Sequence, residues 1–489
     1  MSIAPLLGPA LARGPAELSG EGGGPLERVR RGAVDLALLA VVCAYLLTAL
    51  VGLPLFQDGG WYFFKIATTG QVELPNLRYT AVLPQLPAAW AASRIADPVL
   101  LRHLFALGYV ALPIASLLAC WALVRRRAPV LFLFPLLWFL LNLVNFSGVS
   151  ELLSCLYLTW PLVLAMLLAP ARRWVWLAAA IVPPMLVALH PLAFLPAFAL
   201  ALLGAALAWL LPNLRRIWGV LALWSLGSGL LRLAWTLVGM NDYERGRLET
   251  DSAINYLMTN TWGQHLLLIV VLMLGLTLGV GLLLRGRAQG LILGFARVLA
   301  GLVPVVAVLV SVEILNGEGI QLKSGVTFVV GLALMGLVSA LVLAPPQLGW
   351  LQLPRWDPRL RGRTSLVMII AVSMVVLLLA KSAAWWTATR GLQNLLAESR
   401  DDCIHLSASE PFALQWPWMR IIDDWVTPMN ALAFRPRLIL DAERGIEPIP
   451  LLLRHDGCAV LSQTGKVELV SWYVRDVHSL DQRFGPLRR

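Results

Sequence analysis

The sequence has 489 residues, of which 58% are hydrophobic and 14% are charged, and its mean hydropathy is +0.74. Soluble domains carry roughly 25% charged residues, so the composition excludes an ordinary soluble protein. At about 20 apolar residues per span, the length accommodates about ten membrane spans and one small soluble domain. The net charge of +11 comes largely from arginines clustered between apolar runs, which indicates membrane topology rather than a nucleic-acid partner.

The chain begins with residues 1–32, which are rich in Gly, Pro and Ala and predict a flexible cytoplasmic tail. The apolar run at about 33–55 is long for a signal-peptide core and lacks a clear cleavage site, which predicts a retained first span. Further apolar runs fall near 98–124, 128–146, 151–169, 174–189, 192–211, 217–238, 265–285, 290–314, 325–344 and 365–388. Residues 33–388 therefore predict an all-α polytopic membrane domain of about eleven transmembrane helices.

Arginine clusters follow every second predicted span, at 125–127, 172–173, 215–216, 285–287 and 355–363. Cytoplasmic loops carry an excess of Lys and Arg, so this pattern predicts a cytoplasmic N-terminus. An odd number of spans then places the C-terminal residues in the periplasm of a bacterial inner-membrane protein. The prolines within 174–211 leave open whether that stretch forms two short helices or one broken helix.

The C-terminal region, 389–489, has the composition of a soluble domain. Turn dipeptides at 456–457 and 464–465 separate short β-prone runs, which predicts a small extracytoplasmic α+β or β-rich domain. Cys403 and Cys458 are the only cysteines of this region. In an oxidising compartment they are a candidate disulfide pair.

The first outer loop, 56–97, opens with an acid and two glycines, Asp58-Gly59-Gly60, followed by the aromatic residues 61–64. Paired glycines permit close approach of the backbone to a ligand, so this stretch indicates a catalytic loop. Asp58 could alternatively be a helix cap or a solvated acid. The aromatic residues also fit an interfacial belt, and we expect that interpretation to hold for at least two of them.

Other polar residues fall at the outer ends of predicted spans, where each needs a structural or functional reason. Lys65 and Arg78 suit either lipid phosphates or a substrate phosphate. Glu151 begins the fourth span, as a first-turn carboxylate favoured by the helix dipole or as a site residue. His190 lies in a turn, and Arg232 lies near the outer end of the seventh span. Because all share one face, we expect a polar cavity that opens outward.

The loop residues resemble the GT-C superfamily of polytopic membrane glycosyltransferases, through Asp58-Gly59-Gly60-Trp61-Tyr62-Phe63, Arg78 and the stretch 83–87 that contains Gln85. About eleven spans with an outer C-terminal domain are also similar to that superfamily. The resemblance implies a sugar donor on a polyprenyl phosphate, with Asp58 as catalytic base and Glu151 as a second acid. No acidic pair stands at 58–59 and no Trp-Trp-Asp signature follows, which favours transfer of a single sugar.

We therefore expect an inverting hexosyl- or pentosyltransferase of cell-envelope polysaccharide synthesis, with a glycan or lipid acceptor outside the cytoplasm. Such a reaction needs a base for the acceptor hydroxyl and cations for the phosphate. The candidate substrate-binding residues are Lys65, Arg78, Gln85, His190 and Arg232. The expected partners are the donor, the acceptor and membrane lipids, without nucleic acid. The sequence leaves open the sugar, the acceptor and a requirement for a divalent metal.

Three other functions fit parts of the sequence. In a polysaccharide polymerase or ligase, the centre would be the outer loop 240–264, which contains Arg245 and Arg247. A secondary transporter would show internal repeats and paired broken helices, and the sequence shows no repeat. A non-enzymatic membrane scaffold is the third alternative.

Overall fold

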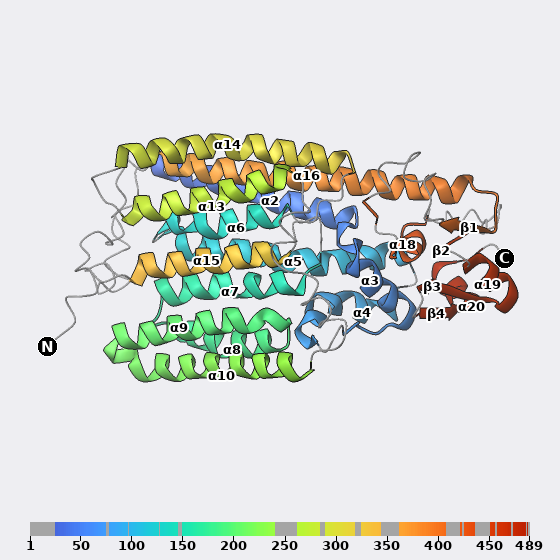
Figure 1. Ribbon diagram of the computed structural model, residues 1–489, viewed down its shortest axis with the longest axis horizontal. Helices are drawn as coiled ribbons and strands as arrows, with labels where there is room; N and C mark the ends of the chain where they lie inside the picture. Colours follow the sequence, from blue (N-terminus) through green and yellow to red (C-terminus); the bar gives the residue numbers. More distant parts are fainter. Residues whose placement is uncertain are drawn as a thin grey trace.

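The computed structural model describes residues 25–74, 78–95, 97–126, 128–144, 149–239, 262–283, 289–317, 324–343, 361–406, 421–422, 425–435, 450–454, 457–470, 473–485 and 487. Within these ranges, long apolar helices run side by side in one bundle (Figure 1). Large apolar side chains of α9, α10, α13 and α14 are exposed on its outside, as lipid-facing surfaces require. The chain is thus an all-α polytopic membrane protein.

Nine helices in the described ranges are long and apolar enough to cross a membrane. They include α2 (Pro25–Leu50), α5 (Pro98–Val124), α7 (Glu151–Leu168), α9 (Phe194–Leu210), α10 (Arg215–Gly239), α13 (Trp262–Leu283), α14 (Gln289–Leu315), α15 (Ser324–Leu343) and α16 (Arg361–Glu398). Two shorter apolar helices are α6 (Leu133–Asn142), which follows the 3-10 turn η4 (Pro129–Phe132), and α8 (Arg173–Val187). Helices α9 and α10 pack together, as do α14 and α16, α2 and α16, and α5 and α7.

Two helices extend past the boundaries that the sequence predicted for the tail and the membrane domain. Helix α2 begins at Pro25, inside the expected tail, because proline is well tolerated at the first helical position. The rest of that tail, 1–24, lies outside the described residues. Helix α16 continues past the expected domain boundary to Glu398, and its 38 residues span roughly 57 Å at 1.5 Å per residue. This length exceeds the roughly 30 Å hydrocarbon core, and the helix reaches the C-terminal strands (Figure 1).

The stretch 174–211, left open by the sequence, forms two helices, α8 and α9. The 3-10 turn η5 (Pro191–Ala193) joins them, and a further turn, η6 (Pro212–Leu214), follows α9. Proline fixes φ and lacks an N–H, so Pro191 favours the turn over a continuous helix.

The first outer loop covers one end of the bundle (Figure 1). It contains α3 (Asp58–Thr69), the turn η3 (Tyr79–Gln85) and α4 (Leu86–Ala92), and it follows the turn η1 (Leu53–Leu55). A Cβ atom at Gly59 would lie 1.7 Å from Pro54 O, and one at Gly60 would lie 2.7 Å from Leu55 O. The two glycines therefore let α3 pack closely on the backbone of η1.

The aromatic residues of α3 pack inside the protein, so the expectation of an interfacial belt was wrong. Phe64 is buried and stacks on Phe484, with ring centroids 5.9 Å apart. Trp61 lies edge-on to Tyr473 at 4.9 Å. These contacts hold the C-terminal region against the loop, and aromatic pairs contribute about 0.5–1.5 kcal/mol beyond their buried area.

The C-terminal region combines short strands and helices. Strand β1 (Cys403–Leu406) pairs in parallel with β2 (Leu451–Arg454), and β3 (Lys466–Val470) pairs antiparallel with β4 (Tyr473–Asp476). The helices are α18 (Thr427–Ala433), α19 (Gly457–Thr464) and α20 (Val477–Phe484). The run between the two predicted turns is therefore helix α19, which shows that a short apolar run does not define its own secondary structure.

Cys403 and Cys458 form a disulfide bond, the pair that the sequence proposed. The bond joins β1 to α19, with Cα atoms 5.7 Å apart. This separation lies within the usual range of about 4.4–6.8 Å for bonded cysteines.

Candidate functional site

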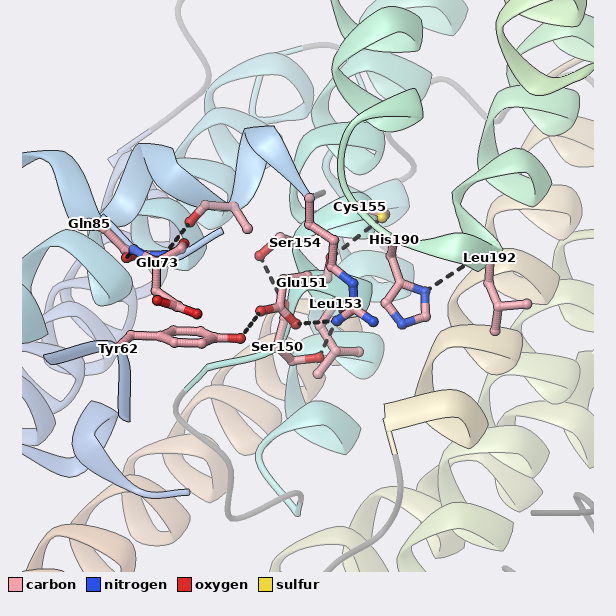
Figure 2. A network of polar contacts seen from close by, with 12 residues as sticks. Tyr62, Glu73, Gln85, Ser150, Glu151, Leu153, Ser154, Cys155, His190 and Leu192 are labelled. Carbon is pink, nitrogen blue, oxygen red and sulfur yellow. Dashed lines mark hydrogen bonds and ion pairs between the residues drawn. The ribbon is translucent and has the colours of Figure 1, made fainter. Parts of the chain in front are cut away.

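Glu151 is the centre of a polar network where the first outer loop meets α7 (Figure 2). Ser150 Oγ accepts a hydrogen bond from Leu153 N at 3.3 Å, so Ser150 caps α7 and Glu151 is its first residue. Glu151 Oε1 accepts a 2.7 Å hydrogen bond from Tyr62 Oη, and Oε2 pairs with Arg78 Nη1 at 3.4 Å. Both charge-assisted contacts and the helix dipole stabilise the ionised acid.

Tyr62 connects the two acids that the sequence proposed. Burial raises the pKa of the Tyr62 phenol well above 10, and the negative charges of Glu151 and then Asp58 raise it further. The phenol therefore keeps its proton at neutral pH and donates a hydrogen bond to Glu151. Asp58 stands four residues before Tyr62 on α3, one helical turn away, and Glu151 accepts the hydrogen bond of Tyr62, so both acids lie near this side chain although they are far apart in the sequence.

Asp58 differs from Glu151 in being exposed. It is the first residue of α3, where the helix dipole favours a negative charge. The preceding residue, Gln57, has φ +49° and ψ −124°, a conformation that costs a non-glycine residue about 1–3 kcal/mol. Gly59 N donates to Phe56 O at 3.2 Å across this strained turn. The turn thus fixes where α3 starts and presents Asp58 at the surface.

Three basic residues lie on the other side of Glu151. His190 is in the turn between α8 and α9, and its Nδ1 accepts a hydrogen bond from Leu192 N at 3.2 Å (Figure 2). Burial lowers the pKa of His190 well below 6.5, and the charges of Arg78 and Arg232 lower it further. Arg232 is buried and donates to Val187 O at 3.0 Å. The histidine is therefore neutral at neutral pH.

Lys65 and Gln85 bind parts of the loop itself. The buried Gln85 amide donates to Glu73 O at 3.0 Å and accepts from Glu73 N at 2.9 Å. Lys65 Nζ lies 3.9 Å from the Glu73 carboxylate and 5.0 Å from the centre of the Tyr473 ring. Both side chains therefore hold the segment around Glu73 in place, a structural role beside the predicted substrate contact.

A cavity of about 60 Å³ adjoins this network, between α2, α5, α6, α7 and α16. Ser150 and Ser154, on either side of Glu151 along α7, contribute to its lining. Its lining also includes Lys381 of α16, which is 3% exposed. Asp58 is not among the lining residues, but Pro54, on which Gly59 packs, is one of them.

Lys381 was missed in the sequence, although a signal for it exists. It lies within the last apolar run, 365–388, where a charged side chain costs about 2.5–3.5 kcal/mol on insertion scales. A cavity is thus present at the end of the bundle that carries α3, but none of the residues expected to line an outward polar cavity is among its lining residues. Ser150, Leu153 and Ser154, next to Glu151 on α7, connect the cavity to the predicted site.

No group of three or more His, Cys, Asp or Glu side chains is placed to hold a metal ion within the described ranges. The loop 240–264, the alternative centre, lies outside the described residues up to position 261. Comparisons of the chain with protein-family models, curated proteins and solved structures found no match. Its function is therefore argued from the geometry of its own residues.

Proposed function

We propose that the protein is a GT-C-like membrane glycosyltransferase that moves one sugar from a polyprenyl-phosphate donor to a glycan or lipid acceptor. The observation that carries the proposal is that Asp58 lies one turn from Tyr62 on α3 while Glu151 bonds to Tyr62, beside a cavity that contains a lysine. Asp58 is exposed and within reach of an acceptor, whereas Glu151 is buried and engaged by Tyr62 and Arg78. The two acids therefore have different roles.

The proposed topology has about eleven spans, counting the shorter helices α6 and α8 with the nine long ones. Arg126 follows α5, Arg172 lies between α7 and α8, and Arg173 is the first residue of α8. These arginines lie at the helix ends opposite the first outer loop, because α5 starts after that loop and α7 starts at Glu151. Basic loops favour the cytoplasm, which supports a cytoplasmic N-terminus and a periplasmic C-terminal domain in a bacterial inner membrane.

In the proposed reaction, Asp58 acts as general base. Its carboxylate takes the proton of the acceptor hydroxyl while the acceptor oxygen bonds to C1 of the sugar. The bond between C1 and the phosphate oxygen breaks on the opposite face, so the configuration at C1 inverts. The polyprenyl phosphate leaves with the electron pair and gains one negative charge, and Asp58 passes its proton to water. Cations near the phosphate stabilise this developing charge.

Glu151 acts as a positioning residue in this scheme. Its contacts to Tyr62 of α3 and to Arg78, which precedes η3, hold two parts of the loop on the first turn of α7. An exposed base at the start of α3 needs such support, because misplacement by about 1 Å can cost 10²-fold in rate.

The proposal is tested by deleting the gene in its native host and restoring it with variants. Asp58→Asn keeps the size of the side chain and removes its basicity, so envelope glycan product should fall by about 10²–10⁴-fold in rate. Glu398→Gln is the matched control, because it neutralises an exposed acid at the end of α16. If the Asp58→Asn protein, at the same abundance in the membrane as the wild type, made a wild-type amount of glycan, Asp58 would be excluded as the base.

A further inference from the structure

We propose that the cavity around Lys381 binds the phosphate group of a lipid phosphate. The inference rests on the proposed function and deepens it, since it places the phosphate of the donor. Lys381 is 3% exposed on a membrane-spanning helix, and an ionisable residue in such a position marks a functional site by default. Among the lining residues that the structure describes, Lys381 is the one Lys or Arg side chain, and none is an Asp or Glu.

The hydroxyl groups of the cavity point to an anion as ligand. Asn142 Nδ2 donates to Tyr157 Oη, so the phenolic proton of Tyr157 is left to donate elsewhere. Ser150 Oγ likewise accepts from Leu153 N and keeps its own proton to donate. Tyr45 Oη is buried and has no hydrogen-bond partner among the described residues. An unmade buried hydrogen bond costs about 1–3 kcal/mol, so these three donors favour a ligand that accepts hydrogen bonds, although Asn142 Oδ1 in the same lining is an acceptor without a described partner.

The position and the walls of the cavity favour a phosphate that carries an apolar chain. The volume of about 60 Å³ exceeds the roughly 10–15 Å³ that one water needs, so a small polyatomic group fits. Leu53, Val110, Leu153 and Leu378 supply apolar walls between membrane helices. A prenyl chain can lie along such walls, whereas a free phosphate ion would leave them without a partner.

The site also fits the chemistry of the transfer step. The donor phosphate carries one negative charge as a diester and two as the departing monoester. A buried ammonium group beside it stabilises the second charge more than the first, because Coulomb energy grows with charge and is large at low dielectric constant. Lys381 should therefore affect both the binding of the product and the rate of transfer.

The test measures binding of farnesyl phosphate to the purified full-length protein by calorimetric titration. Lys381→Met removes the charge and should weaken binding at least about tenfold, the loss expected for one charge-assisted contact. Lys381→Arg should restore most of it. Arg390→Met is the matched control, because Arg390 lies on the same helix and is exposed, and it should bind like the wild type. Should Lys381→Met not fold, Tyr45→Phe removes one proposed donor and should weaken binding about threefold or more.

Equal binding by wild type and Lys381→Met, or no binding by the wild type, would overturn the phosphate site. Competition by inorganic phosphate would show that the phosphate group itself is recognised. Equal competition by phosphatidylglycerol would overturn the assignment in favour of bulk anionic lipid. The two proposals fail separately, because Asp58→Asn tests transfer and Lys381→Met tests binding. Loss of farnesyl phosphate binding in Lys381→Met, together with normal glycan output in Asp58→Asn, would keep the anion site and reject Asp58 as the base.

Discussion

The hydrogen bond between Tyr62 and Glu151 gives a stability prediction of defined size. The two oxygens are 2.7 Å apart, and the side chains belong to residues that are 3% and 8% exposed. A hydrogen bond to a charged group contributes about 1.5–3 kcal/mol, so Tyr62→Phe should lower the free energy of unfolding by that amount. Glu151→Gln also weakens a partly buried ion pair with Arg78 and should cost more than Tyr62→Phe.

The assay is equilibrium unfolding in mixed micelles of dodecyl sulfate and a mild detergent. Tyr79→Phe is the control, because Tyr79 lies in the same loop and is half exposed, so its loss should stay within about 0.5 kcal/mol. The double variant Tyr62→Phe/Glu151→Gln should cost less than the sum of the single changes, because both remove one shared bond. Additive losses, or a Tyr62→Phe variant as stable as Tyr79→Phe, would refute the proposed network.

Three further predictions concern the scaffold. Because the pKa of His190 is lowered in the folded protein, its neutral ring contributes stability above about pH 6.5 that is lost as the pH falls. The melting temperature should therefore drop between about pH 6.5 and pH 5. A His190→Gln variant whose melting temperature fell equally over this range would count against this. Gly59→Ala should lower the free energy of unfolding by about 3 kcal/mol or more in the same micelle assay. Gly219→Ala is the control, because a Cβ atom there meets open space and should leave the stability unchanged. Equal stability of the two variants would contradict the close packing of Gly59. Reduction of the Cys403–Cys458 bond, with its separation of 55 residues, should cost up to about 4 kcal/mol, and free thiols in non-reducing mass spectrometry would remove that bond from the account.

The membrane helices could be predicted because length and apolar composition are properties of a single segment. The run 98–124, for example, coincides with α5. Boundaries moved where a local residue overrides the apolar pattern. Pro25 starts α2 early, and Gly52, with φ +76°, stops the chain from continuing it toward position 55.

The candidate site could be predicted only in part, because its contacts join distant segments. Glu151 stands out as a carboxylate at the start of an apolar run, but its partner Tyr62 is 89 residues away and looked like a membrane-interface aromatic. Gly59 was identified as a point of close approach, yet the sequence does not say whether the neighbour is a ligand or Pro54. Lys381 carries a visible signal in the sequence, an ionisable residue inside an apolar run.

The central claim is that Asp58 removes the proton from the acceptor of a sugar carried on a polyprenyl phosphate. The most direct measurement reconstitutes the purified protein with undecaprenyl-phosphate-linked hexoses and pentoses, radiolabelled in the sugar, and glycan extract of the native envelope. Label should move to the glycan with the wild type and about 10²–10⁴-fold more slowly with Asp58→Asn, while both bind farnesyl phosphate equally. Equal transfer rates for the two proteins, or no transfer from any of these donors by the wild type, would contradict the account.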